Sequence, residues 1–357
     1  MKLLKKVVAM AVLAVLMAMV IQVETNAEQL NVTESLVWGK GYNLEVPRTY
    51  GESHSYKYTM HLQQSGKVSF AVNNDSTGME LYIYNLSSEA VYGSRYSYIG
   101  DGFNSYSIEL LAGDYTVEFR KEKHSYAGTT SFVASFVPSG ETVTENYMYK
   151  NNQVGTASSY AIGTTVKAHF AKNDDTDIYV MNVNKSGYLT MKYSSNVTKF
   201  HMKLVNANGD VTYEQKDIPL GASNYKYFVP KGTYYISFVR GGNDYTGTYT
   251  FSSKFSGMTV TKVKTVKNLK GKKAKLTWSK KSDVNGYQVQ VAQNKKFTKG
   301  KKSKVVAVSS YSHPKSYTFT KLKKGKTYYA RVRTFKLVNG QRYYSDWSAA
   351  KKFKVNK

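Results

Sequence analysis

The sequence predicts an all-β protein: three β-sandwich domains in tandem, after a signal peptide that is cleaved. Short runs alternate apolar with polar residues, as Val68, Phe70 and Val72 do, and glycines separate the runs. Such alternation is typical of half-buried strands. After residue 27, no stretch keeps the 3.6-residue period of an amphipathic helix. One pattern of about 120 residues also occurs twice, which indicates a duplicated domain.

Residues 1–27 are predicted to be a signal peptide. Three lysines within the first six residues precede an apolar run at 7–21. This run is short for a membrane span, and Thr25-Asn26-Ala27 provides small residues for cleavage. An uncleaved membrane anchor is the alternative. We therefore expect a secreted protein with no membrane span after cleavage.

The chain contains no cysteine. Secreted domains commonly use disulfides, so their absence fits export from a bacterium whose exported proteins fold without them. It also excludes thiol nucleophiles and cysteine-based metal sites.

The predicted domains at 28–138 and 139–256 are copies of one another. The segment 58–66 lines up with 179–187, an offset of 121 residues. The same offset places Val68, Phe70 and Val72 on Leu189, Met191 and Tyr193. The matched apolar positions predict two copies of one β-sandwich, because a repeat of this length is a whole domain and not a solenoid unit.

The second copy carries three short motifs: Asp177-Ile178-Tyr179, Ser186-Gly187-Tyr188-Leu189 and Gly232-Thr233-Tyr234-Tyr235-Ile236. In these motifs the chain resembles the bacterial pre-peptidase C-terminal domain, over roughly 40–136 and 160–255. The resemblance implies two jelly-roll-like sandwiches of a kind that accompanies secreted enzymes or binds polymers and is not itself catalytic.

The predicted third domain, 257–357, has its own motifs. Leu276 and Trp278 share one strand, and Tyr287, Val289 and Val291 alternate in the next. Further motifs are Leu322 with Gly325 and Tyr328, the hairpin signal Asn339-Gly340, and Trp347-Ser348. Here the chain resembles a fibronectin type III domain, an immunoglobulin-like sandwich. The resemblance implies a corner at which the Tyr328 hydroxyl bonds to backbone. Lysine-rich versions are common in secreted proteins of gram-positive bacteria, which is the source we expect.

This third domain also carries nearly all the excess charge. From Gly257 onward, 28 basic residues face two acidic ones, a net charge of +26 against +27 for the whole chain. Residues 28–256 have 20 basic and 21 acidic residues. A field of this size attracts polyanions. The candidate polyanion-binding residues are Lys295, Lys296, Lys299, Lys301, Lys302, Lys304, Lys323, Lys324, Arg331 and Arg333.

For a secreted protein, the expected partner is an anionic cell-wall polymer such as teichoic acid, or an acidic glycan, bound in a salt-sensitive way. Wall association of the secreted protein follows from this partner. A solvated surface without a specific partner stays open as the alternative. Nucleic acid is not expected, because the chain is exported and contains no helix that reads a groove.

Two further sites are candidates. A stretch rich in tyrosine, serine and glycine at 91–107 would contact glycan or a protein partner through Tyr92, Tyr96, Tyr98 and Tyr106. The alternative is that these tyrosines belong to strands. The acidic loop Asp174-Asp175-Thr176-Asp177 would hold Ca²⁺ through Asp174, Asp175 and Asp177. Its alternative is a solvated turn without any cofactor.

No catalytic constellation is visible. The six histidines are scattered, and none belongs to a zinc-binding or nucleophile motif. We therefore expect a binding or adhesion protein and not an enzyme. The alternatives are a structural spacer or accessory protein that works with a separate secreted enzyme, and an unusual hydrolase within a sandwich.

Overall fold

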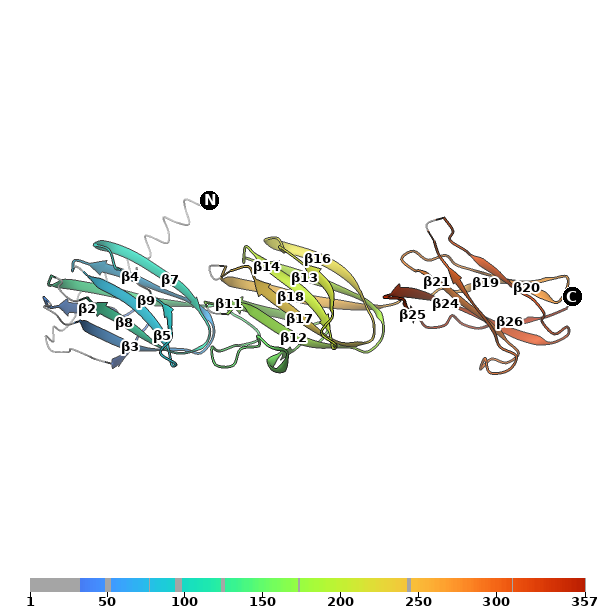
Figure 1. Cartoon of the computed structure of the whole chain (residues 1–357), viewed down its shortest axis with the longest axis horizontal. Coiled ribbons are helices and arrows are strands. Elements are labelled where there is room, and N and C mark those ends of the chain that lie inside the picture. The colour runs from blue at the N-terminus through green and yellow to red at the C-terminus, as the bar shows by residue number, and fades with distance from the viewer. Residues whose placement is uncertain are drawn as a thin grey trace. The chain divides into compact units, whose positions relative to one another are not determined.

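The computed structural model describes residues 33–48, 53–76, 78–93, 98–122, 126–172, 174–242, 245–309 and 311–356 (Figure 1). The predicted signal peptide lies outside these residues. Within them the chain is almost entirely β-strand, and the single helical turn is the 3-10 element η1 (Val154–Thr156). No helix in this described part is long and apolar enough to cross a membrane. The predicted all-β fold class is confirmed.

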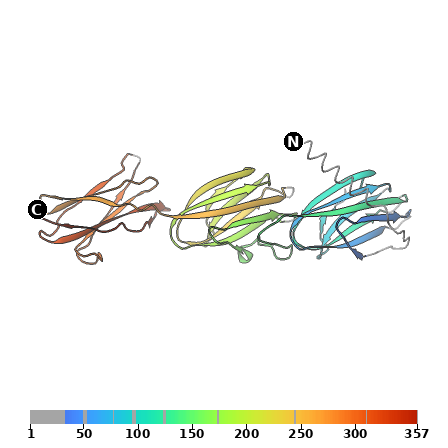
Figure 2. The same cartoon turned by 180° about the vertical axis from the view of Figure 1, so that it is seen from behind.

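The first sandwich consists of two sheets, with strand orders β1-β3-β8-β5-β6 and β2-β9-β4-β7 (Figures 1 and 2). Its edge strand β1 runs parallel to β3, and the other strands pair antiparallel. The strands are β1 (Thr33–Ser35), β2 (Gly41–Val46), β3 (His54–Leu62), β4 (Gly66–Asn74), β5 (Met79–Asn85), β6 (Ala90–Tyr92), β7 (Gly102–Leu110), β8 (Gly113–Lys121) and β9 (Gly128–Pro138).

The second sandwich repeats this topology strand for strand. Its sheets have the orders β10-β12-β17-β14-β15 and β11-β18-β13-β16, and β10 again runs parallel to its neighbour β12. The strands are β10 (Ser158–Ser159), β11 (Thr165–Phe170), β12 (Thr176–Val183), β13 (Gly187–Ser195), β14 (Phe200–Asn206), β15 (Val211–Gln215), β16 (Gly221–Val229), β17 (Gly232–Arg240) and β18 (Gly247–Gly257). Each strand number is that of its counterpart plus nine, so the structure shows the duplication that the matched apolar positions predict.

The alternation of apolar and polar residues along the strands determines which side chains form the core of each copy. In the first copy, Val68, Phe70 and Val72 of β4 are at most 1% exposed, and their polar neighbours point outward. Aliphatic side chains make up most of this core, and aromatic rings pack among them, with Phe119 stacked on Phe132 at 4.3 Å between ring centroids. Large rings bury much apolar area per residue, so they contribute strongly to the stability of this core.

The third sandwich has a three-stranded sheet, β19-β20-β23, and a sheet β22-β21-β24-β25 in which β26 also pairs with β24. Its core contains Trp278, Tyr287, Tyr328 and the valines that alternate along β21 and β24. The strands are β19 (Val263–Leu269), β20 (Lys273–Trp278), β21 (Gly286–Ala292), β22 (Lys302–Ala307), β23 (Ser316–Phe319), β24 (Thr327–Val338), β25 (Gln341–Tyr344) and β26 (Lys351–Lys354).

Two predicted details of this sandwich are confirmed. Asn339 and Gly340 join β24 to β25 with φ values of 46° and 78°, the positive angles that a tight hairpin requires. The Tyr328 hydroxyl accepts a hydrogen bond from the backbone N–H of Lys323 at 3.2 Å. It also accepts one from Nε2 of Gln293 at 3.0 Å. This is the expected tyrosine corner.

The chain forms two compact units. The first comprises Met1–Met181, Lys192–Asn224 and Tyr234–Ser252, and the second comprises Asn182–Met191, Tyr225–Thr233 and Ser253–Lys357. The predicted domain boundaries at 138/139 and 256/257 stay predictions.

Candidate functional site

Three buried carboxylates meet inside the second sandwich. Glu145 comes from the segment before β10, and Asp174 and Asp177 flank the start of β12. One oxygen from each lies within 4.8 Å of the others. Asp174 and Asp177 are fully buried and Glu145 is 7% exposed. We call these three residues the acidic group.

The buried carboxylates of the acidic group form few hydrogen bonds that would replace those lost to water. Glu145 accepts the backbone N–H of Asn151 at 2.6 Å, and Asp177 accepts the Tyr249 hydroxyl. Both oxygens of Asp174 and Oδ1 of Asp177 have no hydrogen-bond partner among the described residues. A buried, unpaired carboxylate is costly unless a proton or a cation neutralises it.

The pKa values of the group follow from this environment. Burial, with the nearby Glu145 carboxylate as the second cause, raises the pKa of Asp174 to about 7. Burial and the two neighbouring carboxylates raise the pKa of Asp177 well above its usual value. Burial also raises the pKa of Glu145. Each carboxylate therefore disfavours charge on the next, and the group as a whole favours a bound positive charge.

The donor set matches a hard cation. All of its ligand atoms are oxygens, and Oδ1 of Asn152 is a further buried oxygen without a hydrogen-bond partner in the described part of the chain. Calcium is bound by carboxylate and amide oxygens of this kind, whereas zinc favours histidine and cysteine. The residues therefore fit a Ca²⁺ ion.

Sequence reasoning identified only part of this group. It included Asp174 and Asp177, but it also included Asp175, whose side chain is exposed and does not join them. It missed Glu145, since an acid in a connecting segment, 29 positions before Asp174, carries no local signal.

The first sandwich has no such acidic group among its described residues, although it too buries a positively charged side chain. At the offset of 121 residues, Tyr56 stands where the second copy has Asp177. Lys121, at the end of β8, is fully buried and donates hydrogen bonds to the carbonyls of Pro47, at 2.8 Å, and Tyr126. Burial lowers the pKa of Lys121. The counterpart of Lys121 at the end of β17 is the buried Arg240.

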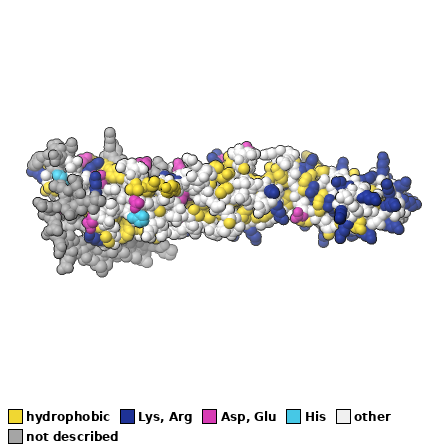
Figure 3. Space-filling view, turned by 90° about the horizontal axis from the view of Figure 1, so that it is seen from below, with side chains coloured by type: hydrophobic (Ala, Val, Ile, Leu, Met, Phe, Trp, Pro, Cys, Tyr) yellow, Lys and Arg dark blue, Asp and Glu magenta, His cyan; other side chains and the backbone are white. Residues whose placement is uncertain are grey.

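The basic module, residues 257–357, is the second candidate site. Figure 3 shows its Lys and Arg side chains crowded over the surface of this part of the chain. Its two acids are already paired. Asp283 lies 2.5 Å from Nζ of Lys336, and Asp346 lies 3.7 Å from Nζ of Lys185. The remaining lysines of the module have no carboxylate side chain of their own module to pair with.

Three lysine-rich turns of the module meet at one end. The Leu322 N–H donates to the Lys272 carbonyl at 3.0 Å, which joins the turn 320–326 to the turn 270–272. Nζ of Lys302 donates to the carbonyls of Thr320 and Lys321, and the Tyr328 hydroxyl links Gln293 to Lys323. These bonds bring in the loop 293–301. We call the three turns the basic end, and its exposed lysines are Lys270, Lys272, Lys295, Lys296, Lys299, Lys301, Lys321, Lys323, Lys324 and Lys326.

Six of the ten predicted polyanion-binding residues therefore lie in the basic end: Lys295, Lys296, Lys299, Lys301, Lys323 and Lys324. Lys304 is exposed on β22. Lys302 is half-buried, and its ammonium is bonded to the two carbonyls named above.

Arg331 and Arg333 are half-buried on the outer face of β24. Their guanidinium groups stack on Phe297, Trp347 and Tyr344 at 3.8–4.3 Å from the ring centroids. They also donate hydrogen bonds to Oε1 of Gln290 and Gln288. Burial lowers the pKa of both arginines. These contacts give the two arginines a structural role, whatever else they bind.

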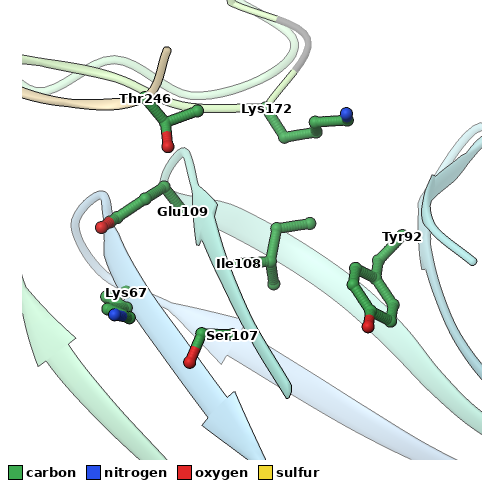
Figure 4. A pocket seen from close by; sticks show the side chains of 7 residues that line it. All are labelled: Lys67, Tyr92, Ser107, Ile108, Glu109, Lys172 and Thr246. Atoms are coloured by element: carbon green, nitrogen blue, oxygen red, sulfur yellow. The ribbon is translucent and has the colours of Figure 1, made fainter. Parts of the chain in front are cut away.

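The tyrosines of the predicted glycan-binding or partner-binding site have different surroundings in the structure. Tyr92 and Tyr106 are partly buried against the core of the first sandwich, and the Tyr98 hydroxyl donates to Glu122 at 2.6 Å. Tyr96 lies outside the described residues. Tyr92 also lines an open hollow of about 350 Å³, together with Lys67, Ser107, Ile108, Glu109, Lys172 and Thr246 (Figure 4). Ile108 lies between Tyr92 and Glu109 in this view.

His169 lies beside this hollow and is 3% exposed. Its Nε2 is 3.4 Å from Oε2 of Glu109, and neither ring nitrogen has a hydrogen-bond partner among the described residues. Burial, with a smaller contribution from Lys167, lowers the pKa of His169 to about 4. The histidine is therefore neutral at physiological pH and is not an anion-binding group.

Comparison with known proteins agrees with this architecture. Residues 259–351 match the family model of the fibronectin type III domain, which confirms that prediction for the C-terminal part of the chain. A search of curated proteins found no match.

Several solved structures are similar. The pre-peptidase C-terminal domain of collagenase from Bacillus anthracis is 20% identical, with a TM-score of 0.26, and the match covers 28% of this chain and 94% of that one. A two-domain fibronectin type III segment of chicken tenascin is 18% identical, with a TM-score of 0.30, covering 51% and 100%. The FN1-FN3 domains of chicken CNTN1 are 11% identical, with a TM-score of 0.23, covering 89% and 97%. These similarities do not identify a ligand.

Proposed function

We propose that this chain is a secreted, non-catalytic binding protein of a gram-positive bacterium, held by its basic module on an anionic cell-wall polymer or an acidic glycan. The observation that carries the proposal is the basic end. Three lysine-rich turns are bonded together there, and both acids of the module are already paired elsewhere. Clustered, uncompensated lysines raise the local concentration of polyanions and speed their capture.

Sedimentation of the chain with isolated gram-positive cell walls, over a salt series, tests this function. We expect binding to weaken steeply with salt, because each lysine contact releases a counter-ion. A variant with Lys295, Lys296, Lys323 and Lys324 changed to glutamine should lower the slope of log affinity against log salt by roughly 3, at about 0.7 per contact.

The matched control changes four lysines of the second sandwich, Lys192, Lys199, Lys203 and Lys216, to glutamine. Equal binding by the parent chain and both variants at every salt concentration would show that the basic end is a solvated surface. Capture of one protein partner that salt does not disturb would instead favour the alternative function, an accessory module of a separate secreted enzyme.

We also propose that the acidic group binds Ca²⁺. Full burial of Asp174 and Asp177, with three of their four oxygens lacking a hydrogen-bond partner, favours this second function. A ligand that binds only the folded state stabilises it, by about 2.7 kcal/mol at a hundredfold excess over its dissociation constant. Calcium should therefore raise the melting temperature of the chain, and a chelator should lower it again.

Two asparagine variants distinguish the acidic group from the exposed loop beside it. Asp177→Asn should abolish the calcium response. Without calcium it should be at least as stable as the parent, because it removes a buried like charge. Asp175→Asn is the control and should keep the response. A parent chain whose melting temperature ignores calcium, or an equal loss of response in the two variants, contradicts the proposal.

A further inference from the structure

The outer face of the sheet β19-β20-β23 carries lysines in a second arrangement, separate from the exposed turns of the basic end. Lys267 of β19 lies directly opposite Lys275 of β20. Both side chains are exposed, and Thr318 of β23 is the next residue in the same row. Residues directly opposite in an antiparallel pair have Cβ atoms about 5 Å apart. The ladder therefore fixes the bases of the two lysine side chains side by side.

This arrangement is unfavourable for the free protein. Like charges directly opposite on a sheet destabilise it. Neither Lys267 nor Lys275 has an acidic partner among the described residues, and both acids of the basic module are paired elsewhere. Lys273, two residues along β20, is exposed on the same face and about 7 Å from Lys275. Several bound anionic groups would neutralise these lysines.

Hydroxyl groups form the neighbouring row. Thr265 lies opposite Thr277, which in turn lies opposite Ser316. The Thr265 and Thr277 hydroxyl oxygens are 2.6 Å apart. β19, β20 and β23 contain neither an acid nor an arginine. The face therefore offers ammonium groups and hydroxyl donors on rigid strands.

The chemistry of this face suits the phosphodiester groups of a linear polymer. Lysine binds phosphate as a point charge, and the threonine and serine hydroxyls of the neighbouring row can donate hydrogen bonds to its oxygens. The row is also continuous with the basic end, since Lys273 directly follows its turn 270–272. A linear polymer bound at that end would extend along the strands.

We propose that the outer face of β19-β20-β23 binds a polyol-phosphate polymer, with the Lys267–Lys275 pair holding one phosphodiester group, Lys273 holding the next, and the Thr265–Thr277–Ser316 row donating hydrogen bonds to their oxygens. This inference rests on the proposed retention by polyanions. It goes further, because it assigns a face, a register and phosphate as the anion.

Binding of the full-length mature chain to polyglycerol phosphate, measured over a salt series, tests the inference. Lys267→Thr with Lys275→Thr should weaken binding about tenfold at low salt and lower the salt slope by about 1.4, at 0.7 per contact. Threonine suits an exposed strand position, so the variant should fold. Its melting temperature at low salt should equal or exceed that of the parent, because the opposed charges are gone.

The matched control is Lys295→Thr with Lys296→Thr, which removes the same charge from a loop of the basic end. A smaller loss in this control supports the inference. An equal or larger loss overturns it and leaves the retention by polyanions standing. Unchanged binding in both variants and in the four-lysine variant of the basic end would remove the proposed function as well. Polyglutamate bound as tightly as polyglycerol phosphate would overturn the assignment of phosphate.

Discussion

The hydroxyl of Tyr328 shows how much one atom contributes at the corner of the basic module. It accepts hydrogen bonds from the Lys323 N–H and from the Gln293 side chain, so it links two turns of the basic end. The ring below it is buried. The hydroxyl therefore orients exposed lysines without itself contacting a ligand.

Tyr328→Phe should lower the free energy of unfolding by about 1 kcal/mol, because it removes one acceptor and keeps the packed ring. Urea unfolding of the module, followed by the fluorescence of its buried Trp278, measures this change. Tyr311→Phe is the control, since Tyr311 is 99% exposed. Equal midpoints for the Tyr328 variant and the parent chain would show that the corner bond adds nothing.

His169 gives the first unit a defined response to acid. Burial lowers its pKa to about 4, against an ordinary value near 6.5, so the folded chain holds it neutral where the unfolded chain protonates it. The contribution of neutral His169 to the free energy of unfolding is complete above pH 6.5. It is lost as the pH falls towards 4, by up to ~3 kcal/mol. Burial raises the pKa of the facing Glu109, so protonation of Glu109 increases the stability of the folded chain as the pH falls, opposite to the effect of His169.

We expect His169→Gln to flatten the fall in stability between pH 6.5 and 4. Denaturant midpoints of variant and parent across this range provide the measurement, and the difference between them isolates the histidine from Glu109. His61→Gln is the control, because the His61 side chain is 63% exposed. A parallel fall in parent and variant would exclude His169 as the cause.

At the scale of elements, the outer face of β24 is built as a stack of alternating charges and rings. Arg331 lies between Phe297 and Trp347, and Arg333 lies between Trp347 and Tyr344. The segment 345–350 is bound to β24 by two serines, since Ser345 Oγ accepts the Thr334 N–H and Ser348 Oγ accepts the Val332 N–H. Together with the two serines, the stacking of Trp347 on both arginines holds the segment between β25 and β26 against β24.

Trp347→Ala should cost about 1–3 kcal/mol of stability, because it removes two cation–π contacts and the apolar area of the ring. Thermal unfolding of the full chain measures the loss. Tyr311→Ala is the matched control, because it also truncates an aromatic residue of this module but loses no burial. A shift in melting temperature no larger than that of the control would show that the stack is only a surface feature.

The edge strand β22 illustrates what sequence reasoning could not distinguish. Lys302 and Lys304 lie opposite Val291 and Val289, in the phase of β21 that faces the core. Charged side chains in an inward phase discourage pairing with another chain at an exposed edge. In the sequence they are two more lysines of a basic run. Only the register of β22 on β21 shows that these two lysines also protect the sheet edge from pairing with another chain.

For the whole molecule, the dominant property is the uneven distribution of charge. The basic module carries +26, and residues 28–256 carry −1. Self-repulsion of this size destabilises a compact module, and salt screens it. Stability should therefore depend on salt in one part of the chain and not in the other.

Raising salt from 10 mM to 0.5 M should raise the melting temperature of the basic module by several degrees and leave that of the sandwiches nearly unchanged. Calorimetry resolves the transitions, and tryptophan fluorescence of a Trp38→Phe variant, whose remaining Trp278 and Trp347 both lie in the module, identifies the one that belongs to the module. Equal shifts in all transitions would indicate a general effect of salt on burial, and not screening of lysine repulsion.

The sequence predicted the features of the fold that depend on local patterns. Alternation located the strands of the core, the offset of 121 residues indicated the duplication, and Asn339-Gly340 marked a hairpin. The sites depend on pairing between distant segments. Glu145 joins Asp174 and Asp177, His169 approaches Glu109, and Lys267 opposes Lys275 only once topology and register are known. Pairing between segments this far apart in the chain leaves no local signal in the sequence.

The buried Lys121 has a consequence for the order in which the two copies become stable. Its ammonium gives the first sandwich a positive charge supplied by the chain, so that copy is complete as soon as it has folded. The second sandwich supplies one buried positive charge of its own, Arg240, against the three carboxylates of the acidic group. If that group takes calcium, the copy must collect the additional charge from the surroundings. Calcium is scarce in cytosol and plentiful outside cells. If the chain is exported, as we propose, export would be the step that stabilises the second copy, while the first copy needs no calcium.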